Sequence, residues 1–191
     1  QSAKIEASAI DNMCSMMIHR GPDSAGIYVE NRYCPVVGFG HRRLSIIDLS
    51  ESAHQPMSNK DKTIWIVFNG EIYNFRELRK TLEDKGHKFN SHSDTEVIVH
   101  LYEEEGIDCV KKLRGMFALA IWDLNNKTIL LARDRFGKKP LLYFFKDGLF
   151  SFASEFNALL ACADISKEIN LKAIPDYMTF GYIPAPESIY S

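Results

Sequence analysis

The segment that most constrains this chain is an apolar run, Thr63-Ile64-Trp65-Ile66-Val67-Phe68. β-Branched and aromatic residues dominate it, as is typical of a strand. Because almost no polar residue interrupts the run, both faces of this strand are expected to be covered by other elements. The chain must therefore supply structure to pack on either side of the run.

The spacing of apolar residues and the turn signals predict elements on both sides of this run. Ser93 and Glu96 are spaced as a capping box at the start of one helix. Asn125-Asn126 and Asp147-Gly148 are typical of hairpin turns. The order of elements predicts an α+β fold with antiparallel sheets and helices packed on their faces. Helices are predicted at 5–18, 75–85, 94–106, 107–113, 154–161 and 171–177, and strands at 27–30, 36–39, 44–47, 63–68, 117–122, 128–132, 141–145 and 149–153.

Length and charge exclude several classes of function. The chain has 191 residues, which indicates one domain or one domain plus a fragment. A net charge of −2 and the lack of a long basic block argue against nucleic-acid and membrane-surface partners. No apolar run approaches the roughly 20 residues of a membrane span. The four cysteines are far apart with no CxxC pair, which suits a reducing cytoplasm.

Neither a metal nor a phosphate site is predicted. The six histidines show no metal-ligand spacing such as HExxH. Arg133-Asp134-Arg135 has the charge to bind phosphate, but a structural ion-pair network at a strand end is the favoured interpretation.

Polar residues beside the apolar run suggest a site for a free amino acid. Asn69 and Gly70 follow the run directly, and an amide with a backbone N–H can donate to one developing oxyanion. Arg43 can grip a carboxylate with two hydrogen bonds, and Glu71 and Asp94 can accept from an ammonium group. Each residue also has an ordinary structural reading: a turn for Asn-Gly, an ion pair for Arg43, a solvated side chain for Glu71 and a helix cap for Asp94.

Several ordered motifs together resemble the class II glutamine amidotransferase domain, most closely that of the glutamine-hydrolysing asparagine synthetases. They cover nearly the whole chain in the family's order. The matching motifs are His19-Arg20-Gly21-Pro22-Asp23-Ser24, Arg42-Arg43-Leu44-Ser45-Ile46-Ile47-Asp48, Gln55-Pro56-Met57, Asn69-Gly70-Glu71-Ile72-Tyr73-Asn74, Ser93-Asp94-Thr95-Glu96, Gly115-Met116-Phe117-Ala118, Arg133-Asp134-Arg135-Phe136-Gly137 and Phe152-Ala153-Ser154-Glu155.

The resemblance implies a fold, a reaction and a set of site residues. The fold is the αββα sandwich of N-terminal nucleophile hydrolases, with two antiparallel sheets flanked by helices. The reaction is hydrolysis of glutamine to glutamate and ammonia, without a cofactor or a metal in this domain. By the same resemblance, Asn69 and Gly70 form the oxyanion hole. The residues implied to bind glutamine are Arg43, Leu44, Ser45, Ile46, Ile47, Asn69, Gly70, Glu71 and Asp94.

The chain departs from the family pattern at its start. The family's nucleophile is an N-terminal cysteine whose own α-amino group acts as base. This chain begins Gln1-Ser2, so we expect the cysteine to precede residue 1 and these residues alone to lack glutaminase activity. None of Cys14, Cys34, Cys109 and Cys162 lies in a matching motif.

The resemblance also implies partners. Residues 1–165 are expected to form the amidotransferase domain, and 166–191 the connection to a C-terminal synthetase domain that binds ATP and Mg²⁺ and amidates aspartate. The expected partners are glutamine and that domain, and a homodimer stays open as the assembly. Two alternatives stay open as well: a non-catalytic domain that binds glutamine or a partner, and the glutaminase domain of another ATP-dependent amidotransferase.

Overall fold

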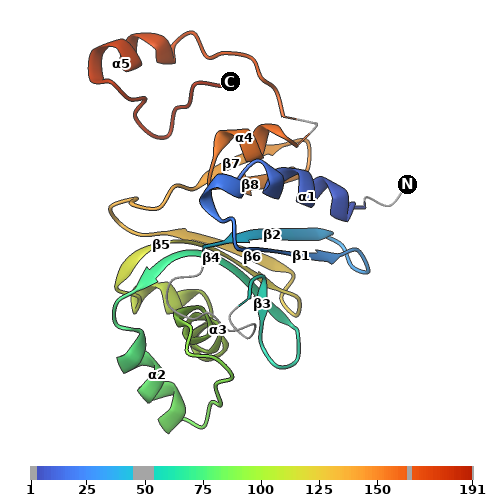
Figure 1. The fold of residues 1–191 in the computed structure, drawn as a ribbon, viewed down its shortest axis with the longest axis vertical. Coiled ribbons are helices and arrows are strands. Elements are labelled where there is room, and N and C mark those ends of the chain that lie inside the picture. The colour runs from blue at the N-terminus through green and yellow to red at the C-terminus, as the bar shows by residue number, and fades with distance from the viewer. Residues whose placement is uncertain (1–3, 45–53, 163–164, 191) are drawn as a thin grey trace.

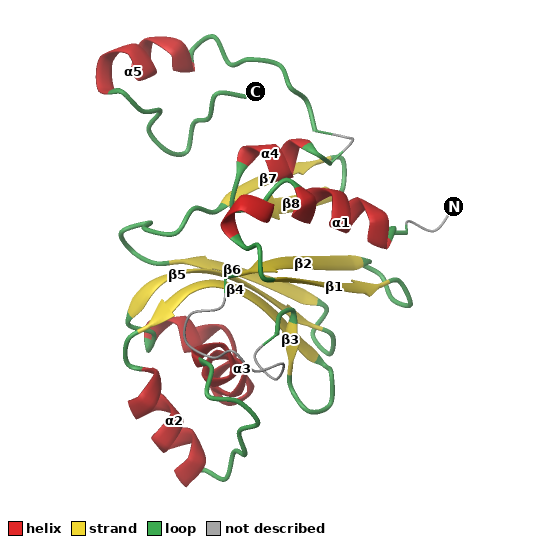
Figure 2. Ribbon diagram, viewed as in Figure 1, coloured by secondary structure: helices red, strands yellow, loops and turns green. Residues whose placement is uncertain are grey.

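The computed structural model describes residues 4–44, 54–162 and 165–190. Figure 1 labels the helices and strands within these ranges, and Figure 2 separates them by type. In chain order they are α1 (Ala7–Ser15), the 3-10 helix η1 (Ile18–Arg20), β1 (Ser24–Glu30), β2 (Val37–Arg43), β3 (Met57–Ser58), β4 (Ile64–Ile72), α2 (Phe75–Asp84), α3 (Asp94–Glu105), the 3-10 helix η3 (Gly106–Lys111), β5 (Gly115–Asp123), β6 (Thr128–Arg133), β7 (Leu142–Lys146), β8 (Leu149–Ala153), α4 (Phe156–Leu160) and α5 (Ala173–Phe180).

All strand pairs in the described ranges are antiparallel, so the predicted mixed α+β class is confirmed. The described strands form a β1–β2 hairpin, a four-stranded sheet in the order β3–β4–β5–β6, and a β7–β8 hairpin. Helices α2 and α3 lie on the outer side of the four-stranded sheet, and α1 lies over the β1–β2 hairpin (Figure 1). Helix α4 packs on β7 and β8.

Two glycines let α1 lie close to β2. A Cβ atom on Gly40 would be 2.4 Å from Cys14 Sγ, and one on Gly38 would be 2.9 Å from Ile10 Cδ1. Contacts this short do not occur for real side chains, so larger residues would push the helix away from the hairpin.

Apolar side chains fill three spaces between the elements. The largest cluster lies between the four-stranded sheet and helices α2 and α3, and it includes Ile66, Phe68, Ile98 and Ile121. The second joins the β1–β2 hairpin to the other face of that sheet through Val37, Phe39, Val67, Ala120 and Trp122. A third joins α4 to the β7–β8 hairpin through Ala153, Ala158, Leu159 and Ile165. The apolar run is thus buried on both faces, as its composition predicts.

Strand pairing extends several elements beyond their predicted ends. β4 continues past Phe68 to Ile72, because residues 69–72 pair with β5. β2 runs to Arg43 rather than ending at residue 39, because Arg43 pairs with Ser24 of β1. Asn69-Gly70 is therefore part of a strand, and the reading of Asn-Gly as a turn is wrong. The strand predicted at 44–47 lies outside the described residues except for Leu44.

The capping box at α3 takes a different form from the predicted one. Ser93 is the N-cap, and its side chain accepts from the Thr95 N–H. The Glu96 carboxylate accepts from the N–H groups of Asn90 and Ser91 instead of from that of Ser93. The turn before α3 is therefore held by the side chain of Glu96, which lies inside the helix.

The last residues form a separate segment above the rest of the molecule in Figure 1. It contains α5, which ends at Gly181 in the left-handed conformation. The ring of Tyr190 contacts that of Phe156 in α4, with centroids 5.6 Å apart. Among the helices of the described ranges, none has the length and apolar character that crossing a membrane requires.

Candidate functional site

The C-terminal half of β4 has one edge that no strand of the described ranges pairs with. The Phe117 carbonyl accepts from the Asp134 N–H, and the Phe117 N–H donates to the Asp134 carboxylate, so both backbone groups of Phe117 point away from β4. Its partner in the register is Gly70, which makes this a pair without hydrogen bonds between β4 and β5. The N–H of Gly70 therefore points away from β5, toward the open edge of β4.

Side chains occupy the positions on either side of Gly70 along this edge. Gln55 both accepts from the Phe68 N–H at 2.6 Å and donates to the Phe68 carbonyl at 3.2 Å. Asp94 Oδ2 accepts from the Ile72 N–H at 2.9 Å. The Gly70 N–H lies between these two bonds and has no acceptor within the described residues. It is a backbone donor that no described residue uses.

The side chains of Asn69 and Glu71 face the space between the two central layers. Val67, two residues before Asn69, packs there against the β1–β2 hairpin, and alternate side chains of a strand share a face. Asn69 is half-buried and Glu71 is exposed, so this space opens to solvent toward the end of the strand.

Arg43 approaches the same space from β2. Phe39 of β2 belongs to the core between the layers, and His41 and Arg43 follow it at intervals of two residues. The imidazole Nε2 of His41 lies 3.2 Å from the Phe68 carbonyl oxygen, which links β2 to β4 directly before Asn69. By this alternation, Arg43 of β2 and Asn69 and Glu71 of β4 lie on the strand faces that look toward each other between the two layers.

His41 is neutral in this arrangement. Burial lowers its pKa to about 4, the bond to Phe68 opposes this effect, and the charge of Arg43 lowers the pKa further. A neutral imidazole bonded to a carbonyl oxygen donates through its N–H, so His41 places no positive charge beside Asn69.

Asp94 is buried, with 5% of its surface exposed. Burial raises the pKa of its carboxyl group, backbone N–H groups including that of Ile72 oppose this, and the charge of Glu71 raises it again. The negative charge of Glu71 thus disfavours the charged form of Asp94. A cation bound beside both carboxylates would offset this effect.

Of the other residues predicted to bind glutamine, one lies within the described ranges and three do not. Leu44 follows β2 and is 54% exposed. Ser45, Ile46 and Ile47 lie outside the described residues. The alternative interpretations from the sequence are an ion pair for Arg43 and a solvated side chain for Glu71. Glu71 is exposed, as a solvated side chain would be.

Gly70 also has a packing role. A Cβ atom there would lie 2.2 Å from the Met116 carbonyl oxygen and 2.7 Å from Phe117 Cα. Only glycine lets β4 and β5 approach this closely, whatever ligand its N–H binds.

The predicted ion-pair network around Arg133 and Asp134 is instead a set of bonds to the backbone. Arg133 Nε donates to the Lys139 carbonyl at 2.6 Å, and Asp134 accepts from the N–H groups of Phe117 and Phe136. Burial would raise the pKa of Asp134, but the backbone donors outweigh it and lower the pKa. These residues close the loop after β6, so their polar groups are already used.

Sequence reasoning gave no role to His41 and Gln55. Both hold the Phe68 carbonyl, and Gln55 also lies 3.4 Å from the Thr95 hydroxyl of α3. The nearest signal was the motif Gln55-Pro56-Met57, which does not show which strand the glutamine side chain would meet.

Two of the four cysteines are poorly suited to act as a nucleophile. Cys14 and Cys109 are buried, and burial raises the pKa of both thiols, that of Cys109 to about 12. Cys34 is exposed in the loop between β1 and β2, and Cys162 is half-buried after α4.

Comparison with known proteins decides the family. The family model described as "Glutamine amidotransferase domain" matches residues 1–191. The chain belongs to this family. The class II amidotransferase resemblance inferred from the motifs is thereby confirmed.

Curated relatives of this amidotransferase domain are much longer proteins. Asparagine synthetase [glutamine-hydrolyzing] 1 of Bacillus subtilis is 47% identical over 180 residues, which cover 94% of this chain and 28% of the relative. Putative asparagine synthetase [glutamine-hydrolyzing] 2 of Methanocaldococcus jannaschii is 42% identical over 201 residues, which cover 95% of this chain and 38% of the relative. The chain thus spans well under half the length of these relatives.

Solved structures support the fold of the amidotransferase domain. A glutamine phosphoribosylpyrophosphate amidotransferase from B. subtilis superposes with a TM-score of 0.70 at 22% identity, covering 84% of this chain and 42% of that one. A structure described as the allosteric regulatory enzyme of purine biosynthesis gives a TM-score of 0.68 at 20% identity, with the same coverage. At these identities the likeness concerns the fold alone.

Proposed function

We propose that this chain is the glutaminase domain of an asparagine synthetase. It would hydrolyse glutamine to glutamate and ammonia for the ATP-dependent amidation of aspartate. The relatives support this role, since those at 47% and 42% identity are named as glutamine-hydrolysing asparagine synthetases. The fold would then be the αββα sandwich of N-terminal nucleophile hydrolases.

The observation that carries the proposal is the Gly70 N–H at the open edge of β4. It lies between the edge bonds made by Gln55 and Asp94, with Asn69 next to it in the strand. We assign the Gly70 N–H and the Asn69 amide to the oxyanion that forms when a nucleophile attacks the glutamine side-chain carbonyl. The pairing of β4 with β5 fixes the backbone of both residues before the reaction, and donors held in advance are the effective ones.

The amino-acid end of glutamine would be held by charge. Arg43 would bind the α-carboxylate, and Asp94 with Glu71 would bind the α-ammonium. Burial is the main cause of the raised pKa of Asp94, and the charge of Glu71 raises it further, so an ammonium group beside both carboxylates would offset these effects, which supports this assignment. Leu44, Ser45, Ile46 and Ile47 would complete the pocket.

The nucleophile would be the family's N-terminal cysteine, which the resemblance places before residue 1. An α-amino group with a pKa near 7.7–8 can take the thiol proton at neutral pH. The kinetic test therefore uses the protein expressed from its native start. Attack of the thiolate on the side-chain amide would form a thioester as the C–N bond breaks, and the protonated α-amino group would give its proton to the departing ammonia. Water would then hydrolyse the thioester to glutamate and the free thiol.

The tail fits a connection to a second domain. Leu171 and Met178 in residues 166–190 are 73% and 77% exposed. Exposed apolar side chains of this kind are suited to packing against another domain. That domain would hold ATP and Mg²⁺, as the resemblance implies. The four cysteines form no disulfide, which supports a reducing compartment such as the cytoplasm.

The deciding experiment compares Asn69→Ala with the unmodified full-length protein. Losing one oxyanion donor lowers kcat by about 10²–10³, so glutamine-dependent ammonia release should fall by that factor. Asparagine formation from added ammonia should be unchanged, because the synthetase site is untouched. Loss of both activities would instead give Asn69 a structural role. Glutamine binding without ammonia release by the unmodified protein would favour the non-catalytic alternative.

A further inference from the structure

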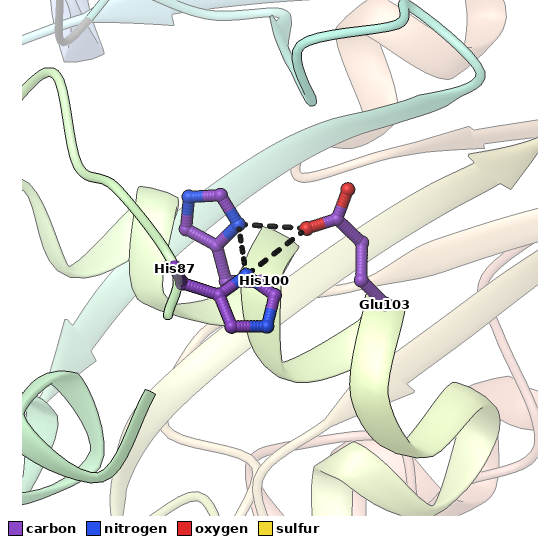
Figure 3. A group of neighbouring side chains, drawn as sticks. All are labelled: His87, His100 and Glu103. Carbon is purple, nitrogen blue, oxygen red and sulfur yellow. Dashed lines mark hydrogen bonds and ion pairs between the residues drawn. The ribbon is translucent and has the colours of Figure 1, made fainter. Parts of the chain in front are cut away.

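Two histidines and a glutamate meet on the outer side of α3, away from the open edge of β4. His87 follows Gly86 in the loop after α2, and His100 and Glu103 lie on one face of α3. Figure 3 shows the three side chains turned toward one another. This is the one group in the described ranges whose histidine, cysteine and carboxylate atoms lie close enough together to hold a metal ion.

The ligand atoms have the spacing of a tetrahedral site. His87 Nδ1 and His100 Nδ1 are 3.1 Å apart, and Glu103 Oε2 is 2.7 Å from His100 Nδ1 and 3.6 Å from His87 Nδ1. Zinc bonds of 2.0–2.2 Å at tetrahedral angles separate neighbouring ligand atoms by about 3.3–3.5 Å. The three separations bracket this value, and the shortest of them, between His100 and Glu103, would have to lengthen by about 0.6–0.8 Å around an ion.

The opposite nitrogen of each ring faces a carboxylate. His87 Nε2 lies 3.0 Å from Glu104 Oε1, and His100 Nε2 lies 3.9 Å from Glu96 Oε1. A metal-bound histidine commonly donates its second N–H to such a carboxylate, which fixes the ring and leaves the first nitrogen bare for the metal. Glu103 is also held, because its other oxygen accepts from the Asn59 amide at 3.0 Å.

Hydrogen bonds alone satisfy this cluster poorly. The Nδ1 atom of His100 contacts both His87 Nδ1 and Glu103 Oε2, yet it carries at most one proton to share between them. The buried Nε2 atom of His100 has no hydrogen-bond partner among the described residues. With a metal on both Nδ1 atoms, the proton of each ring moves to Nε2, on the side of the ring that faces a carboxylate.

We propose that His87 Nδ1, His100 Nδ1 and Glu103 Oε2 bind one zinc ion, with a solvent molecule as the fourth ligand. Two imidazoles and one carboxylate are a ligand set that zinc accepts. The ion would fasten the loop after α2 to α3, the helix that begins with Asp94. The proposal is independent of the glutaminase role, because none of these ligands belongs to the glutamine site.

The histidine spacing in the sequence predicts no such site, because the two rings meet only through packing. Helix α2 packs on α3, and the turn at Gly86 brings His87 back to His100, which is thirteen positions further along the chain. The Phe89 ring also packs edge-on against His100, with centroids 4.7 Å apart, which holds the imidazole in place.

The test is metal binding by the purified chain after treatment with a chelator. Zn²⁺ is titrated against a chromophoric competitor, and Co²⁺ replaces it as a spectroscopic probe of tetrahedral geometry. We expect one equivalent of either metal to bind. Zinc at about a hundredfold excess over its dissociation constant should raise Tm by about 5–10 °C.

Variants separate the three ligands from their surroundings. His100→Ala and Glu103→Gln should each abolish the zinc-dependent rise in Tm, and the glutamine in the second variant keeps an acceptor for Asn59. Glu104→Ala should weaken zinc binding by about 10–100-fold, as expected for a group that orients a ligand. His54→Ala, which replaces an exposed histidine outside the cluster, should bind zinc like the unmodified chain.

Two results would overturn the proposal. One is the absence of a stoichiometric zinc complex in the folded, unmodified chain. The other is unchanged zinc affinity in folded Glu103→Gln. Either result leaves the glutaminase proposal standing, because that proposal is tested by ammonia release.

Discussion

The carboxylate of Asp94 accepts the N–H of Ile72 at 2.9 Å, so the first residue of α3 holds the last residue of β4. Two properties of the Asp94 side chain can therefore be tested separately, its negative charge and its oxygen acceptor. Asp94→Asn keeps an oxygen acceptor for Ile72 but removes the charge assigned to the substrate ammonium. Asp94→Ala removes both and leaves a buried N–H unpaired.

We expect Asp94→Ala to lower the free energy of unfolding by about 1–3 kcal/mol, the cost of that unpaired group. Asp94→Asn should stay close to the unmodified protein in stability while KM for glutamine rises. Chemical denaturation and steady-state kinetics of the full-length protein provide the two measurements. If Asp94→Asn leaves KM unchanged, Asp94 is only a strap between α3 and β4.

Arg43→Lys should raise KM for glutamine by about 10–100-fold, the loss of charge-assisted hydrogen bonds worth about 1.5–3 kcal/mol. A lysine ammonium cannot reproduce the two-pronged grip of a guanidinium on a carboxylate. The α-carboxylate keeps its charge during the reaction, so kcat should fall less than KM rises.

Arg32→Lys is the matched control for Arg43→Lys. Arg32 is paired with Glu30, and its side chain is 74% exposed. Its replacement should leave both kinetic constants unchanged. Equal effects of the two substitutions on KM would remove the assigned role of Arg43.

Gly70→Ala should destabilise the domain by about 1–3 kcal/mol or more, because its Cβ atom would lie 2.2 Å from the Met116 carbonyl oxygen. Asn69→Ala, one position earlier in β4, adds no such clash and should unfold at nearly the unmodified denaturant concentration. Urea denaturation of both variants gives the comparison. Equal midpoints would mean that β4 and β5 separate easily, and that Gly70 has no packing role.

Glu96 supplies a pH-dependent part of the stability. Burial alone would raise its pKa, but the nearby His100 imidazole and the hydrogen bonds from Ser91 and Asn90 outweigh burial and lower the pKa to about 2. A carboxyl whose folded pKa lies below its unfolded value stabilises the protein above the unfolded value. That stability is lost as the pH falls from about 4.5 toward 2.

Glu96→Gln should therefore cost about 1–3 kcal/mol at pH 7, and the cost should shrink as the pH falls through this window. Denaturation of both proteins at several pH values between 7 and 3 measures the difference. A cost that does not change with pH would show that packing, rather than charge, accounts for the role of Glu96.

The local pattern predicted most elements but could not set the ends of the central strands. The apolar run ends at Phe68, yet β4 continues to Ile72 because β5 pairs with its polar residues as well. Such pairing depends on a strand more than forty residues away along the sequence. The β7–β8 hairpin was predictable, because Asp147 and Gly148 both adopt the positive φ angles that a tight hairpin turn requires.

The sequence predicted the residues of the candidate site, but not the side chains that hold the neighbouring backbone in place. Asn69, Gly70 and Glu71 stand out because polar residues directly follow an apolar run. The contact of His41 with Phe68 arises only when the β1–β2 hairpin packs on β4, and that of Gln55 only when the segment before β3 lies along β4. No spacing along the sequence encodes them.

The side chains of Gln55 and Asp94 also bear on the solubility of this domain. An open strand edge is a template on which another chain can add a strand, and such growth leads to aggregation. Gln55 occupies the backbone groups of Phe68, and Asp94 occupies the N–H of Ile72. An incoming strand would have to displace both, and it would meet a carboxylate at one end. The edge of β4 can thus offer the Gly70 N–H to a small molecule, while the two side chains hinder the pairing of a second polypeptide strand.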